Sequence, residues 1–190
     1  MTPELALHVA ISLPFAAGVL ALLIPRRINI ATKLLTVLVS AAVLAAAIVL
    51  HGAGGYAWAP EWAGGRTLLG VDGLSGFVLL GVGFFSLALA IYSAGFVRDE
   101  EVSTRGFFAN FLWVVGAACA TVLARDLLVL FVFWALMGIP FFLLVNLGGR
   151  GAGAAAKKTL IVLGGSDSVM ILGIAMLYKG RLIAAGTPEE

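Results

Sequence analysis

The 190-residue chain is too apolar for a soluble protein: 62% of its residues are hydrophobic and only 12% are charged. Soluble domains carry about 25% charged residues, so the composition predicts an integral membrane protein. The net charge of +2 gives no reason to expect a nucleic-acid partner, and the single cysteine, Cys119, excludes an intramolecular disulfide.

About six apolar stretches reach the roughly 17 to 25 residues that a transmembrane helix needs. They cover residues 5–24, 30–50, 74–96, 107–123, 127–147 and 158–178. We therefore predict an all-α membrane protein in which residues 1–190 form a single transmembrane domain in the lipid bilayer. The longest connection, 51–72, carries Trp58 and Trp62, which we expect at the headgroup level because amphipathic rings favour that region.

The basic residues predict how the chain is oriented, because cytoplasmic loops carry an excess of Lys and Arg. With about six helices both termini lie on one side, where the sequence places Arg66, Arg125, Lys179 and Arg181. The other side has Arg26, Arg27, Lys33, Arg98, Arg105, Arg150, Lys157 and Lys158. We therefore predict a multi-pass protein of the cell inner (cytoplasmic) membrane with both termini outside.

Small residues are expected at the helix contacts, since apolar area alone does not drive helix association in lipid. The segment 41–47 of the second stretch and Gly81 and Gly83 of the third fit that role. Pro140 lies inside the fifth stretch, where it removes one backbone hydrogen bond and crowds the carbonyl of Leu136. We expect a local kink there.

Asp167 is the most informative single residue, because it lies near the middle of the apolar stretch 160–178. A carboxylate at the bilayer centre costs roughly 3 kcal/mol on insertion scales, and it commonly marks an ion or proton path. The residues around it, 164–168, are small or hydroxylated, so helices and waters can approach the carboxylate. The alternative is a structural aspartate whose charge a neighbouring helix satisfies.

Lys158 precedes Asp167 by nine residues, which in a helix is about 13.5 Å along the axis and places the two on opposite faces. The two side chains are therefore not expected to pair directly. At the start of the sixth stretch, Lys158 suits a role as a headgroup anchor, and this interpretation stands beside a functional one.

The remaining polar residues lie at predicted helix ends. Asp72 precedes the third stretch and Asp126 begins the fifth, so each suits the role of a helix N-cap. His8 and His51 lie near the ends of the first and second stretches, where we expect interfacial or packing histidines rather than titrating groups.

Several motifs follow one another in a fixed order and spacing within about residues 65 to 178. They are Gly-Val-Asp-Gly-Leu-Ser at 70–75, Tyr-Ser-Ala-Gly-Phe at 92–96, Arg-Asp-Leu-Leu-Val-Leu-Phe-Val-Phe-Trp at 125–134, Leu-Met-Gly-Ile-Pro at 136–140, Ala-Ala-Lys-Lys at 155–158, Gly-Ser-Asp at 165–167 and Leu-Gly-Ile-Ala-Met-Leu-Tyr at 172–178. Together they closely resemble the antiporter-like membrane subunits of respiratory complex I. That family includes subunits of multi-subunit sodium/proton antiporters and of membrane-bound energy-converting hydrogenases.

The resemblance implies the N-terminal part of the antiporter-like fold and a proton- or cation-translocating module within a larger membrane complex. In that family a glutamate on the fifth helix, carboxylates and lysines on neighbouring helices, and a central water file carry protons. By position, Lys158 and Asp167 match the family's lysine and aspartate on the sixth helix, whereas Asp72 and Asp126 match polar positions at helix ends.

Two departures from the family pattern bear on function. The family's glutamate follows the tryptophan of the fifth helix, but here Trp134 is followed by Ala135, which cannot carry a proton. Members of the family have about fourteen helices, arranged as two inverted units with flanking helices, whereas this sequence ends after the sixth stretch. We therefore expect partner membrane subunits, among them a chain that supplies the missing helices.

Three functional interpretations remain open. The chain contributes part of an ion path through Asp167, or it is a non-conducting structural subunit that stabilises or couples the membrane arm, or it is an unrelated small carrier that acts as a homo-oligomer. No catalytic or metal-ligand pattern is present in the sequence, so we expect no cofactor and no chemistry in this chain. Any redox chemistry would belong to partner subunits.

Overall fold

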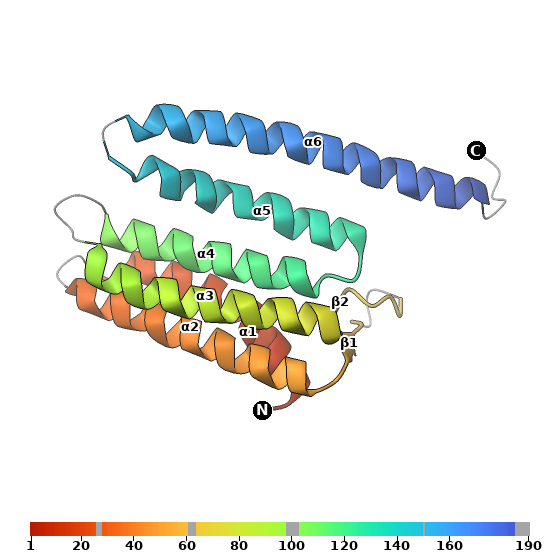
Figure 1. The fold of residues 1–190 in the computed structure, drawn as a ribbon, viewed down its shortest axis with the longest axis horizontal. Coiled ribbons are helices and arrows are strands. Elements are labelled where there is room, and N and C mark those ends of the chain that lie inside the picture. Colours follow the sequence, from red (N-terminus) through yellow and green to blue (C-terminus); the bar gives the residue numbers. More distant parts are fainter. Residues whose placement is uncertain (26–27, 61–63, 98–102, 150, 185–190) are drawn as a thin grey trace.

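Six long helices make up almost all of the computed structural model, which describes residues 1–25, 28–60, 64–97, 103–149 and 151–184 (Figure 1). The helices are α1 (Pro3–Leu23), α2 (Asn29–Gly52), α3 (Gly73–Phe96), α4 (Thr104–Leu123), α5 (Leu127–Asn146) and α6 (Ala152–Ala184). Within the described residues, each of these six is long and apolar enough to cross a membrane. The predicted all-α membrane fold is confirmed.

The sixth helix is longer than the sequence predicted. It begins at Ala152 rather than at Lys158, and it continues to Ala184 beyond Tyr178. The segment 152–156, expected to be a linker, contains four alanines, which favour helix. The chain turns before it, at Gly149 and Gly151, whose positive φ angles suit glycine.

The connection between α2 and α3 contains a small sheet that the sequence analysis did not predict. Strand β1 (Tyr56–Trp58) pairs antiparallel with β2 (Leu69–Val71), with Ala57 opposite Gly70. The backbone N–H of Arg125 donates to the carbonyl of Leu68 over 2.9 Å, and Leu69 forms a bridge with Ala124. The sheet is thereby fixed to the turn between α4 and α5.

The core lies among α1, α2, α3 and α4, which pack through small residues as expected. A Cβ added at Gly83 would lie 2.9 Å from the Cα of Leu44, so this glycine allows α2 and α3 to approach closely. Gly81 does not share that role, because a Cβ there would meet nothing within 4 Å. Among the described residues, Gly81 therefore makes no close helix contact, in contrast to the prediction.

Helix α5 packs on α4, and α6 packs on the outer side of α5 (Figure 1). Pro140 is the buried residue of α5, and Ala156 and Ile174 are those of α6, among the described residues. The helical span of α5 continues across Pro140, and the kink expected there stays a prediction. Most of the surface of these two helices is therefore open to lipid or to another protein.

Successive helices alternate in direction, so the N-terminus, the small sheet and the end of α6 lie at one end of the bundle (Figure 1). At the opposite end, the Lys33 ammonium donates to the carbonyls of Ala94 and Val97 over 2.9 and 2.8 Å. Cations are favourable at such helix C-termini. The side of the membrane on which each end lies stays a prediction, and four of the arginines on which it rests, Arg26, Arg27, Arg98 and Arg150, lie outside the described residues. Trp62, which we expected at the headgroup level, also lies outside them.

Candidate ion-translocation site

Asp167 lies near the middle of α6, on the face that packs against α5. The better-buried residues of α6 recur every three or four positions, as expected for one face of a helix. They include Ala156, Leu163, Asp167, Met170, Ile174 and Tyr178. From Ala152 to Asp167 the helix rises about 22 Å, which places the carboxylate far from both ends of the helix.

The carboxylate of Asp167 is held by a tryptophan of the neighbouring helix. The indole Nε1–H of Trp134 on α5 donates to Oδ1 of Asp167 over 3.1 Å. An indole donates only and carries no charge at any ordinary pH. Oδ2 of Asp167 has no hydrogen-bond partner among the described residues, so it is the oxygen available to a proton, an ion or water.

Lys158 and Asp167 are not brought together. Lys158 is exposed in the second turn of α6, off the face that packs against α5, as its nine-residue separation from Asp167 predicted. It does not begin the helix, because α6 starts at Ala152. The choice between an anchor and a functional lysine stays open.

Asp72 is the N-cap of α3, as predicted. Its carboxylate accepts from the Ser75 backbone N–H over 2.8 Å, and the Ser75 hydroxyl in turn accepts from the Asp72 backbone N–H, which completes a capping box. Arg125 also pairs with Asp72, at 2.8 Å. The Ser75 N–H first, and then the Arg125 guanidinium, hold the pKa of Asp72 well below its usual range.

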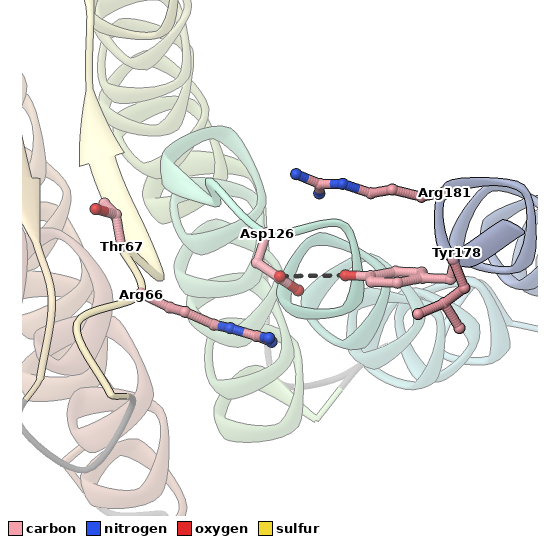
Figure 2. A pocket seen from close by; sticks show the side chains of 6 residues that line it. Arg66, Thr67, Asp126, Tyr178 and Arg181 are labelled. Carbon is pink, nitrogen blue, oxygen red and sulfur yellow. Dashed lines mark hydrogen bonds between the residues drawn. The ribbon is translucent and has the colours of Figure 1, made fainter. Parts of the chain in front are cut away.

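Asp126 is the N-cap of α5, also as predicted, and it has a further partner on α6. Oδ1 accepts from the backbone N–H groups of Leu128 and Val129, while the Tyr178 hydroxyl donates to Oδ2 over 3.2 Å (Figure 2). Tyr178 lies eleven residues after Asp167, which is about three turns on the same face of α6. The α5–α6 contact therefore carries two interhelical hydrogen bonds.

Both of those interhelical donors were missed by sequence reasoning. Trp134 of α5 and Tyr178 of α6 each carry one hydrogen-bonding group on an aromatic ring, and such groups usually pair with a polar partner within reach. Asp167 and Tyr178 share one face of α6, and α5 carries a possible partner for each of them in Trp134 and Asp126. This signal could have predicted that α6 packs against α5.

The ring contact of His8 fits the packing interpretation. His8 is exposed and contacts Trp58 of β1 edge to face, with ring centroids 5.4 Å apart. Across the part of the chain that the structure describes, no three His, Cys, Asp or Glu residues gather as a metal site would require.

The fold and site define a multi-pass helical membrane protein with a carboxylate held between two of its helices. Residues 124–181 match the family model described as NADH:quinone oxidoreductase/Mrp antiporter, transmembrane. Over these residues the chain is similar to the antiporter-like membrane subunits of this family.

Individual relatives agree with the family match. The chain is 35% identical over 131 residues to NAD(P)H-quinone oxidoreductase chain 4 2 of Synechococcus elongatus, which is 68% of this chain and 24% of that protein. It is 30% identical over 122 residues to NADH-quinone oxidoreductase subunit N of Desulforudis audaxviator, which is 64% and 24% of the two chains. Subunit M of the Escherichia coli enzyme is 29% identical over 136 residues, 68% of this chain and 26% of that protein. These matches span about a quarter of each relative's length.

Proposed function

We propose that this chain is a membrane subunit of a proton- or cation-translocating complex and that Asp167 supplies one carboxylate of the ion path. The observation that carries the proposal is the position of Asp167: midway along a membrane-length helix, facing α5, with one carboxylate oxygen hydrogen-bonded and the other open. A carboxylate at such a depth in the membrane costs free energy, and in membrane proteins such residues commonly line ion or proton paths.

The neighbour of Asp167 strengthens the proposal. The resemblance led us to expect a glutamate directly after Trp134, where the sequence has Ala135. The Trp134 indole is instead within hydrogen-bond distance of Asp167 on the facing helix. In this proposal a carboxylate is still present beside Trp134, but α6 supplies it rather than α5.

The rest of the path and the partners are part of the same proposal. One carboxylate cannot by itself carry an ion across a hydrocarbon core of about 30 Å. Other membrane subunits, including a chain with the further helices of the family fold, would therefore complete the path. The exposed outer faces of α5 and α6 leave room for such helices. We place the complex, of the NADH-quinone oxidoreductase, antiporter or hydrogenase type, in the cell inner membrane with both termini of this chain outside.

The test is ion flux in liposomes that contain the assembled complex, with Asp167→Asn as the variant. Asparagine keeps the size and the hydrogen bond from Trp134 but cannot bind a transferable proton, so we expect a loss of tenfold or more. Ser168→Ala is the matched control, because its hydroxyl donates only to the Gly164 carbonyl of its own helix. Unchanged flux in a fully assembled Asp167→Asn complex would refute the proposal.

The second candidate function is a non-conducting structural subunit. Ala135 favours it, because the position where the family keeps its glutamate cannot be protonated here. In that case, removal of the chain would break the complex apart rather than leave it assembled and uncoupled, and Ala135→Glu would not raise ion flux. Native gel analysis of the deletion strain separates the two functions.

A further inference from the structure

A cavity of about 520 Å³ lies at the end of the α5–α6 contact, beside the small sheet (Figure 2). Arg66 and Thr67 contribute to its wall from the segment before β2, Asp126 from the start of α5, and Tyr178, Arg181 and Leu182 from the end of α6. The hydrogen bonds of Leu68 to Trp58 and Arg125 fix that segment to the turn before α5. The cavity is therefore built from three parts of the chain that are anchored to one another.

Among the described residues that line this cavity, positively charged side chains outnumber negatively charged ones. In the view of Figure 2, the side chains of Arg66 and Arg181 extend on either side of the Asp126–Tyr178 hydrogen bond. Asp126 already accepts from two backbone N–H groups and from Tyr178. Among the residues that the structure describes, neither arginine has a hydrogen bond or an ion pair. Two guanidinium groups therefore face one carboxylate that is already engaged.

We propose that Arg66 and Arg181 bind the phosphate of an anionic phospholipid in this cavity. The fork of N–H donors on a guanidinium matches the oxygens of a phosphate, and it carries its charge at all ordinary pH values. The Thr67 and Tyr178 hydroxyls lie on the same wall and can add neutral hydrogen bonds. The volume falls in the range of about 300 to 1,000 Å³ typical of small-molecule sites.

The position of the cavity favours a lipid over a soluble phosphate. The apolar part of α6 ends at Tyr178, and tyrosines favour the headgroup level. A smaller adjoining cavity of about 160 Å³ shares Asp126, Tyr178 and Arg181 but is also lined by Leu127 and Leu177. Both leucines are exposed, at 43% and 63%. A phosphate held by the arginines would thus have an apolar surface for its acyl chains directly beside it.

The test compares lipid binding to the purified chain by native mass spectrometry, with phosphatidylglycerol, phosphatidylcholine and inorganic phosphate as separate probes. We expect phosphatidylglycerol to bind in preference to phosphatidylcholine, and inorganic phosphate not to displace it. Arg66→Gln/Arg181→Gln should weaken phosphatidylglycerol binding about a hundredfold, since each of the two lost charged hydrogen bonds is worth about a factor of ten.

The control is Lys157→Gln/Lys158→Gln, which removes two positive charges near the other end of α6. An equal loss in both double variants would show general surface attraction and overturn the proposal. Displacement by inorganic phosphate, or binding that survives the loss of both arginines, would overturn it too. Arg66→Lys/Arg181→Lys should retain more binding than the glutamine variant, which separates loss of the site from misfolding. The result is independent of ion flux through Asp167.

Discussion

The Trp134–Asp167 hydrogen bond fixes an ionisable group between two helices that have few other polar contacts. Asp167 could be found from the sequence, because a lone carboxylate in an apolar stretch is conspicuous. Its partner could not, because Trp134 reaches it across 33 positions of the sequence. Only the packing of α5 on α6 selects that indole.

A double-mutant cycle measures whether Trp134 and Asp167 are energetically coupled. Trp134→Phe removes the N–H donor and retains an aromatic ring, and Asp167→Ala removes the acceptor. Interhelical hydrogen bonds in membranes are worth about 0.6 to 2 kcal/mol, so we expect a coupling free energy of about 1 kcal/mol in unfolding titrations of the detergent-solubilised protein. Strict additivity of the two single changes would contradict the contact.

Asp72 predicts a pH dependence of stability. Its pKa is lowered in the folded protein by the Ser75 N–H and by Arg125, so its contribution is present above the unfolded pKa of about 3.9 and is lost as the pH falls towards the lower folded value. Acid titration of the thermal midpoint should show this loss below about pH 4. Asp72→Asn should flatten that part of the curve, and a curve unchanged by the substitution would contradict the assignment.

Gly83 lets α3 pack closely against α2. Gly83→Ala places a methyl group 2.9 Å from the Cα of Leu44, and such overpacking typically costs about 1 to 3 kcal/mol. The matched control is Gly81→Ala, which meets nothing within 4 Å and removes a flexible residue from the helix, so it should be neutral or stabilising by up to about 1 kcal/mol. Unfolding titrations of the two variants test the difference, and equal effects would contradict it.

The helices themselves could be predicted because apolar length is encoded locally in the sequence. The six stretches and the capping roles of Asp72 and Asp126 were confirmed for that reason. The ends of α6 were not found, because Lys157 and Lys158 interrupt the apolar stretch without interrupting the helix. The β1–β2 pair depends on contacts between residues 56–58 and 69–71 across a Gly-rich segment, which no local pattern specifies.

For the whole molecule, the contrast between a packed four-helix core and an exposed outer pair indicates where partners would bind. In our proposal this chain works within a larger membrane complex. Helices α5 and α6 present the exposed apolar surface on which its partner subunits would pack. Purification of the tagged chain in mild detergent should therefore recover other membrane subunits. Recovery of a stable, partner-free homo-oligomer that transports ions would contradict this expectation.

The carboxylate of Asp167 is the central group of the proposed ion path, and its role can be measured as ion flux through the assembled complex. Proton flux under an imposed membrane potential should fall at least tenfold with Asp167→Asn and recover at least in part with Asp167→Glu, which restores a carboxylate at the same position. Equal flux in the wild-type, asparagine and glutamate complexes would show that Asp167 carries no ions, and the structural alternative would then stand.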